Sequence, residues 1–413
     1  MRAHFFLLSS ALALTACATA AVEAPSAAPA SAVEAETSEA MSQVTLKRSS
    51  AAVPQQAGDS YYTAAATSVA ERAGADFAPK AKNVILFVGD GMGVSTVTAG
   101  RIYAGQQKGL DGESYRLTME TLPWSAFSKT YSHDAQVADS ASTATAMLSG
   151  VKTGSRTLGL RSGVAYGNCA SAEGQSTDSL FELAEAAGLS TGIVSTARIT
   201  HATPAATYAE SASRNWEDDT ELGDSGCKDI ARQLIDWPAG DGFEIVLGGG
   251  RGPFMPASIM DPETGEPAGR RVDDQNLTDD WRAKSDAHTF IYDQAGFDAT
   301  DFDSDVKVLG LFEPSHMNYA LDRTEDEAGE PSLAELTRAA VTRLSRNEEG
   351  YVLLVEGGRI DHGHHATNAA RALGDTAALD EAVAAALELT DDEETLIIVT
   401  ADHSHTMTIA GYP

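Results

Sequence analysis

The chain contains short segments that are apolar throughout and that alternate with longer segments of helical periodicity. The apolar segments are predicted to be strands and cover residues 83–88, 191–195, 243–247, 351–355 and 395–400. The segments predicted to be helices are 179–187, 228–235, 333–344 and 366–389. Strands that lack polar alternation are buried on both faces. The pattern therefore predicts an α/β fold with a mostly parallel central sheet and helices on both faces.

The composition is strongly acidic. The 413 residues include 60 Asp+Glu and only 29 Lys+Arg, for a formal net charge of -31. Nucleic-acid binding depends on neutralising phosphates with Lys and Arg, so this balance argues against nucleic-acid partners. Hydrophobic residues make up 43% of the chain, which is enough to form the core of one large α/β domain or two ordinary ones.

The N-terminus has the features of an export signal. Residues 5–14 form an apolar run that is too short to span a bilayer. The following Leu14-Thr15-Ala16-Cys17 resembles the lipobox of bacterial lipoproteins, in which the cysteine is lipidated and becomes the mature N-terminus. The alternative is an ordinary secretory signal. Both readings predict export, and the first predicts a lipid anchor at Cys17 on a bacterial membrane, facing the periplasm or the cell surface.

Composition divides the chain into three parts. Residues 1–17 are the predicted signal, and residues 18–79 are rich in Ala, Ser, Pro and Glu, as is typical of a disordered or weakly helical tether. Residues 80–413 are the predicted catalytic domain. Within it, residues 251–305 are polar and rich in Gly and Pro, so we expect an insertion there rather than core.

Polar side chains follow several predicted strands. Asp90 follows the first strand, 196–201 the second, 356–365 the fourth, and Asp402 with His403 the last. Ligands of parallel sheets bind beyond the carboxyl ends of the strands. Carboxylates and imidazoles without cysteine suit zinc, manganese or magnesium. Each residue alone could be a solvated loop residue, but their shared position favours a metal site.

Ser140 lies in a segment of small residues, from Asp139 to Ala146, that is typical of the start of a tightly packed helix. One interpretation is that Asp139 or Ser140 caps the helix. The other is that the serine binds phosphate at the helix N-terminus, where the backbone N–H groups are free. No histidine at a fixed spacing indicates a triad. A bound metal could instead lower the hydroxyl pKa.

Together these motifs resemble the alkaline phosphatase family, especially the animal-type enzymes and their bacterial relatives. The segments that carry the resemblance are 82–93, 137–154, 196–216, 355–365 and 400–405. The resemblance implies hydrolysis of phosphate monoesters through a phosphoserine on Ser140. It also implies a homodimer when the protein is full length.

The resemblance further implies two zinc ions and one magnesium ion. The residues matched to metal ligands are Asp90, Thr203, Glu356, Asp361, His365, Asp402 and His403. Asp402 and His403 would complete the zinc site that activates Ser140, and Asp90 would bridge that zinc and the magnesium.

The remaining matched ligands divide between the other two metals. Asp361 and His365 belong to the second zinc, which activates the leaving oxygen and then the hydrolytic water. Thr203 and Glu356 hold the magnesium together with Asp90. These assignments rest on the resemblance and not on the spacing of the residues.

Other matched residues contact phosphate or lie near the metals. Arg214 would bind two phosphate oxygens with its planar fork of donors, although an arginine before several acidic residues could also be a surface ion pair. His201 and His362 match positions near the magnesium and the phosphate that are not metal ligands in relatives. His405 also matches a non-ligand.

Cys169 and Cys227 could form a disulfide in an oxidising compartment or remain two buried thiols. The resemblance implies the disulfide. It also suggests a calcium site, because the segment 311–314 matches part of such a site in animal relatives. The residues that could form it are Glu263, Phe312, Glu313 and Glu330. The alternative is an ordinary acidic loop.

The printed sequence ends at Pro413, where relatives continue with a further histidine that completes the second zinc site. We therefore expect a C-terminally incomplete sequence without the closing strands of the family. A genuinely short chain with an impaired site is the alternative. The expected properties of the 413 residues are weak binding of one zinc, low activity and low stability. The other functions considered are a phosphodiesterase and a phosphate- or metal-binding lipoprotein without turnover.

Overall fold

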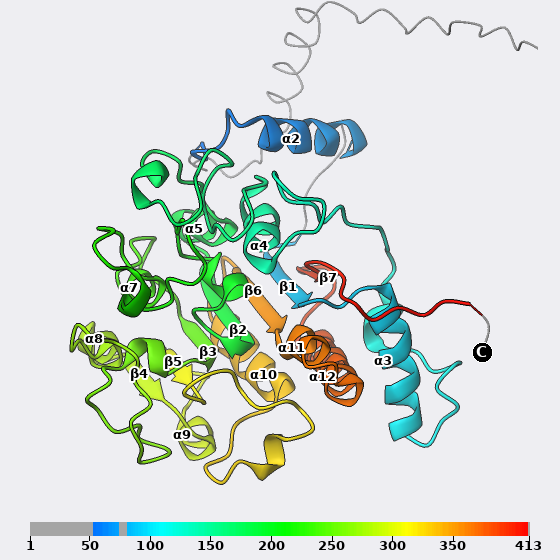
Figure 1. The fold of residues 1–413 in the computed structure, drawn as a ribbon. Helices are drawn as coiled ribbons and strands as arrows, with labels where there is room; N and C mark the ends of the chain where they lie inside the picture. The colour runs from blue at the N-terminus through cyan, green and yellow to red at the C-terminus, as the bar shows by residue number, and fades with distance from the viewer. Residues whose placement is uncertain (1–52, 74–80, 412–413) are drawn as a thin grey trace, which may run out of the picture. The chain divides into compact units, whose positions relative to one another are not determined.

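The computed structural model describes residues 53–73 and 81–411. Its strands form one parallel sheet in the order β4-β5-β3-β2-β6-β1-β7 (Figure 1). Their bounds are β1 (Asn83–Gly89), β2 (Ser190–Arg198), β3 (Ile245–Gly249), β4 (His288–Ile291), β5 (Lys307–Leu311), β6 (Tyr351–Gly357) and β7 (Thr395–Ala401). The predicted α/β class is confirmed.

Side chains of β1 to β6 alternate between two cores, one on each face of the sheet, whereas β7 packs into a core on one face only. In β6, Val352 and Leu354 enter one core, and Leu353 and Val355 enter the other. The first core is covered by α4 (Ser140–Ser149), α5 (Leu180–Ala186), α6 (Ala202–Ala205), α7 (Ile230–Ile235) and α8 (Leu277–Ala283). The second is covered by α3 (Val94–Gln107), α9 (Gln294–Ala299), α10 (Leu333–Leu344), α11 (Arg359–His365) and α12 (Ala369–Leu389). Burial on both faces explains why the strands lack polar alternation.

Local sequence explains where several helices begin. Both α5 and α10 start at a serine whose hydroxyl accepts from the backbone N–H of a glutamate three residues later. Those serines are Ser179 and Ser332, and each glutamate carboxylate accepts from the serine N–H in return. Short 3₁₀ helices lie in the connections, at η1 (Thr118–Thr121), η2 (Cys169–Ala172), η3 (Asp219–Glu221), η4 (Gly252–Phe254) and η5 (Arg323–Glu325).

The expectation that residues 251–305 lie outside the core is wrong for part of this segment. It supplies β4, which pairs with β5 at one edge of the sheet. It also buries Trp281, at 2% exposure, in the first core. Arg251 and Arg271 are buried as well, each in ion pairs with aspartates. Its polar composition reflects both its exposed stretches and the acidic partners of these buried cations.

The predicted tether, residues 18–79, is described only over residues 53–73, where it contains helix α2 (Ser60–Ala73). Just before α2, Gln55 and Gln56 hydrogen-bond to Asp178 and to the Ser149 carbonyl. This part is therefore held against the catalytic domain. The proposed lipidation site Cys17 lies outside the described residues. Among the residues described, no helix is both long and apolar enough to span a membrane.

Strand β7 forms one edge of the sheet and pairs with β1. Ile397 and Val399 pack into the second core, while Leu396 and Ile398 on the opposite face are 47% and 41% exposed. The carboxyl end of β7 nevertheless lies beside that of β1, and this pairing brings the last predicted site residues to the others.

Candidate metal and phosphate site

The carboxyl ends of four adjacent strands, β2, β6, β1 and β7, carry the predicted site residues. Asp90 directly follows β1, Glu356 lies near the end of β6, and Asp402 directly follows β7. The backbone N–H of Gly91 donates to Asp402 at 3.0 Å and so joins the ends of β1 and β7. Gly91 has φ of +65°, and a Cβ there would lie 3.0 Å from a carboxylate oxygen of Asp361, so the turn needs glycine.

Ser140 is the first residue of α4, and Asp139 is the N-cap, with its carboxylate accepting from the Ala141 N–H. The interpretation that Asp139 caps the helix is confirmed, and Ser140 lies at the helix N-terminus, where the phosphate-binding interpretation requires it. The Ser140 Oγ lies 3.2 and 3.3 Å from the two carboxylate oxygens of Asp90. It is also 3.3 Å from Nε2 of His403.

Asp90, Asp402 and His403 form a compact group around the Ser140 hydroxyl, with ligand atoms within 4.8 Å of one another. The Nδ1 atom of His403 lies 2.9 Å from the Ser404 carbonyl. A carbonyl can only accept, so Nδ1 carries the proton and Nε2 presents a lone pair toward the two aspartates. This is the tautomer that a metal ligand requires.

A second group lies beside the first and contains Asp361, His365 and His405. The Nε2 atom of His365 is 3.4 Å from Asp361, and the His365 side chain is 70% exposed. The Nε2 atom of His405 lies 3.3 Å from the other Asp361 oxygen. Because the Thr406 N–H donates to His405 Nδ1 at 2.8 Å, the proton of a neutral His405 lies on Nε2. His405 in this arrangement therefore does not offer the Nε2 lone pair that a metal would need.

The third group joins Asp90, Glu356 and His201. Thr203, also predicted here, is fully buried in α6. Several buried polar atoms of the second and third groups have no hydrogen-bond partner within the described residues, namely Thr203 Oγ1, Glu356 Oε1, Asp361 Oδ1 and His201 Nδ1. An unsatisfied buried polar atom costs about 1–3 kcal/mol. Oxygen-rich donors left without partners are suited to a hard cation such as Mg²⁺.

The carboxylates raise one another's pKa. The pKa of Asp90 lies well above its ordinary value because of burial and because Asp402, Asp361 and Glu356 are close. Burial also raises the pKa of Glu356 to about 7 and raises that of Asp361. Like charges this close are unfavourable without a counter-charge, which cations would supply.

This electrostatic arrangement predicts the effect of pH on the metal-free protein. The Glu356 carboxyl binds a proton more readily in the folded state, with a pKa of about 7, than in the unfolded state, with an ordinary value of 4.5. Its contribution to stability is therefore complete below about pH 4.5 and is lost as the pH rises toward 7. Thermal unfolding in EDTA should show stability falling over this range. With zinc and magnesium added, the fall should be smaller, and parallel curves in the two conditions would contradict the interpretation.

Arg214 lies at the edge of the site, where two groups hold its guanidinium. One Nη atom donates to Asp139 and the other to His201 Nε2, each at 3.0 Å. Although burial raises the pKa of Asp139, the Arg156 N–H and the charge of Arg214 lower it overall, so Asp139 is the anionic partner. His362 lies in α11 beside His201, with ring centroids 5.3 Å apart. His316, which the sequence analysis did not identify, packs against both rings.

Two of the proposed calcium residues, Phe312 and Glu313, directly follow β5. The compact group there contains Glu263, Glu313 and Asp326, and Asp326 was not among the predicted residues. Glu330 lies next to this group, where it accepts from the Asn318 N–H at 2.9 Å. Phe312 is buried and its N–H bonds to the Gly248 carbonyl. Arg251 contacts Glu263 and partly neutralises the group.

The structure contains the predicted disulfide between Cys169 and Cys227, with Cα atoms 5.8 Å apart. Both cysteines pack against a small apolar cluster that includes Trp216, two residues after Arg214. The disulfide thus braces the region of the chain that carries the arginine.

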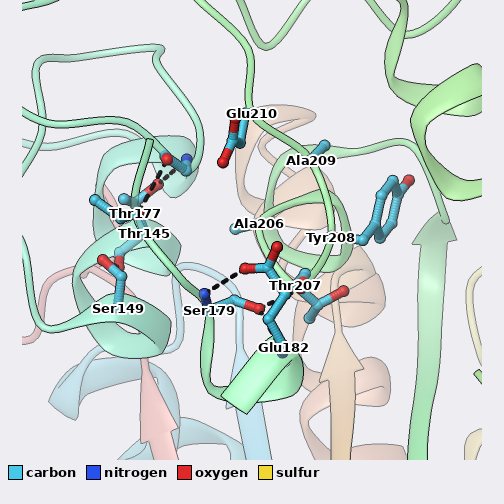
Figure 2. A pocket seen from close by; sticks show the side chains of 11 residues that line it. Thr145, Ser149, Thr177, Ser179, Glu182, Ala206, Thr207, Tyr208, Ala209 and Glu210 are labelled. Carbon is cyan, nitrogen blue, oxygen red and sulfur yellow. Dashed lines mark hydrogen bonds between the residues drawn. The ribbon is translucent and has the colours of Figure 1, made fainter. Parts of the chain in front are cut away.

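A small cavity lies along the second half of α4 (Figure 2). Its walls include Thr145 and Ser149 of α4, and Glu182, whose carboxylate is bonded to the Ser179 N–H. Burial raises the pKa of Glu182 to about 7. None of the predicted site residues lines this cavity, so it is separate from the candidate site.

A buried serine at a helix N-terminus, beside three groups of carboxylate and imidazole ligands, is a site of the class that handles phosphate with metal ions. A family model described as alkaline phosphatase matches residues 81–413. The chain therefore belongs to the alkaline phosphatase family.

Individual relatives agree with this assignment. The tissue-nonspecific isozyme of alkaline phosphatase from Gallus gallus is 45% identical over 342 residues, which cover 80% of this chain and 65% of the relative. The corresponding Homo sapiens isozyme is 44% identical, with 80% and 64% covered. The solved structure of Thermus thermophilus alkaline phosphatase has a TM-score of 0.65 and 30% identity, covering 79% of this chain and 60% of that one. The chain thus spans less than two thirds of the length of these relatives.

Proposed function

We propose that the chain hydrolyses phosphate monoesters to an alcohol and phosphate through a phosphoserine on Ser140, using two zinc ions and one magnesium ion. The observation that carries this proposal is the position of the Ser140 Oγ. It lies at the N-terminus of α4, between Asp90 and His403. The preceding residue, Asp139, accepts a hydrogen bond from Arg214.

The proposed ligands follow the three groups of side chains. Asp90, Asp402 and His403 would hold the zinc beside Ser140, and Asp361 and His365 would hold the other. Asp90, Thr203 and Glu356 would hold magnesium, an ion found in the M3 site of a mutant of the related alkaline phosphatase from the Antarctic bacterium TAB5. Bound metals would lower the pKa of the serine hydroxyl and of water, and would neutralise charge on phosphate oxygens. A calcium ion at Glu263, Glu313 and either Asp326 or Glu330 is a further proposal.

The protein's own groups would position the phosphate. The Ser140 Oγ attacks phosphorus as the ester oxygen leaves with the alcohol, and water later displaces the serine to release phosphate. Phosphoryl transfer has a loose transition state, so positioning and charge neutralisation determine the rate. The free N–H groups at the start of α4 and the two Nη atoms of Arg214 are donors suited to phosphate oxygens.

A comparison of two substrates tests the proposal. With zinc and magnesium present, the chain should hydrolyse p-nitrophenyl phosphate, at the low rate expected above, and leave bis(p-nitrophenyl) phosphate nearly unchanged. Brief reaction with ³²P-labelled monoester, followed by an acid quench, should leave label on a peptide that contains Ser140. Preference for the diester would indicate a phosphodiesterase. Phosphate binding without turnover of either ester would indicate a non-catalytic binding protein.

We also propose export with a lipid anchor at Cys17, and a homodimer for the full-length protein. The lipobox-like sequence ending at Cys17 supports the first. A relative from Bombyx mori, 42% identical over 348 residues, is named membrane-bound alkaline phosphatase, which is a statement about that protein.

A further inference from the structure

Three histidine rings from separate parts of the chain pack against one another beside the proposed phosphate site. The ring centroids of His201 and His316 are 5.3 Å apart, as are those of His201 and His362, and those of His316 and His362 are 4.2 Å apart. His201 follows β2, His316 follows β5 and His362 lies in α11. His316 has no part in the mechanism proposed above, so its place in this cluster needs a separate explanation.

His316 is held by Arg198. The Arg198 backbone N–H lies 3.1 Å from Nδ1 of His316, and an Arg198 Nη atom lies 2.5 Å from Nε2. A neutral imidazole accepts at only one nitrogen, so in either tautomer His316 accepts one hydrogen bond from Arg198. Arg198 is itself fixed by two hydrogen bonds to the Glu217 carboxylate, at 2.6 and 2.7 Å. The His316 ring therefore has a rigid support.

Backbone contacts with β2 and β3 hold the loop that carries His316 close to the site. The Met317 N–H donates to the Thr196 carbonyl at 3.1 Å and ties the loop to β2. At the end of β3, a Cβ on Gly249 would lie 2.4 Å from the Ser315 carbonyl oxygen and 2.8 Å from the Met317 nitrogen. Only glycine lets the loop approach this closely, so the ring position is determined by packed backbone on two sides.

The other end of the cluster reaches the phosphate-binding arginine. His201 accepts from an Arg214 Nη atom at 3.0 Å. The guanidinium is always a donor, so the His201 ring must present its Nε2 lone pair to it. Rotation of this ring would remove one of the two groups that hold Arg214. His316 and His362 pack against the His201 ring and oppose that rotation.

We propose that His316 is a positioning residue for Arg214, acting through the ring of His201. The inference rests on the proposed function for the role of Arg214. His201 accepts from Arg214 and His316 accepts from Arg198, so both rings are neutral and act by shape and as hydrogen-bond acceptors. A cluster of charged imidazoles would instead repel the neighbouring guanidinium groups.

The test compares His316→Ala with His316→Phe. Alanine removes the ring and should weaken competitive inhibition by inorganic phosphate and raise KM for p-nitrophenyl phosphate, each by about tenfold, with a smaller change in kcat. Phenylalanine keeps a ring in the cluster and should restore most of the phosphate affinity. His288→Ala is a matched control, because His288 also packs against an aromatic ring, that of Trp281, at a centroid distance of 4.9 Å. It should leave phosphate affinity unchanged.

Calorimetric titration of inorganic phosphate into metal-loaded Ser140→Ala protein, with and without His316→Ala, measures the same effect without turnover. If the unmutated protein binds phosphate but has no activity, the proposed function is overturned, while the effect of His316→Ala on phosphate affinity can still be measured. Equal phosphate affinity with and without His316→Ala, together with a lower Tm, would show a purely structural role and overturn the inference. A parent that binds no phosphate would overturn both.

Discussion

Replacing Ser140 with alanine should reduce kcat/KM for a phosphate monoester by at least ~10³-fold while the metal content stays the same. The hydroxyl is the proposed nucleophile, and without it only direct attack by water remains. The substitution is small and removes no intrahelical hydrogen bond, because the cap of α4 is the carboxylate of Asp139 and not the serine. The fold should therefore persist, and the loss should be confined to chemistry.

Ser149→Ala is the matched control. Ser149 is the last residue of the same helix and is also buried, with its hydroxyl donating to the Thr145 carbonyl at 2.7 Å. Stability should fall slightly and kcat/KM should stay near that of the parent. If Ser140→Ala retained parental turnover, a nucleophile other than this serine would have to be sought.

Asp90→Asn should lower the metal content and reduce activity by at least ~10²-fold. This estimate is a lower bound, because residues that only support a metal ligand already contribute 10- to 100-fold. Asp90 belongs to two of the three ligand groups and is fully buried, so its charge bears on both. Metal analysis after dialysis should show loss from the serine-side zinc and from the magnesium together.

The same substitution should have the opposite effect on the metal-free fold. The pKa of Asp90 is raised by burial and by three neighbouring carboxylates, so its charge is unfavourable without a cation. In EDTA, Asp90→Asn should unfold at a higher temperature than the parent. Asp375→Asn is the control for metal content, because Asp375 is also buried but lies in α12, where it accepts from the Ala320 N–H, and its substitution should leave the metal content unchanged. Unchanged metal content in Asp90→Asn would contradict the assignment.

The sequence alone predicted the fold class and five strands, β1, β2, β3, β6 and β7. The strands β1, β2 and β6 are buried, β7 is half-buried at one edge, and all four are followed by polar residues, so periodicity and the strand-end rule both pointed to the same end of the sheet. The strands β4 and β5 were not predicted. β4 has only four residues, and β5 contains Gly310, so neither gives a pattern that differs from a loop.

The site residues outside the matched motifs were missed for a related reason. His316 follows β5, and the strand-end rule would have selected it if that strand had been recognised. Asp326 joins the acidic group through the tertiary fold of the connection after β5, which brings it close to Glu263 and Glu313. No local sequence pattern indicates that contact. The segment that buries Arg251 and Arg271 in ion pairs also contains long exposed stretches, so its polar composition did not reveal its buried part.

The order of strands in the sheet also bears on how the protein folds. The Ser140 hydroxyl and His403 are 263 residues apart in the sequence, and Gly91 and Asp402 are 311 apart. Contacts this distant form slowly, because the loop entropy must be lost before they stabilise the chain. Among the described strands β7 is synthesised last, so the ligands beside Ser140 cannot assemble until synthesis has passed it. A nascent chain arrested before β7 would lack that half of the site.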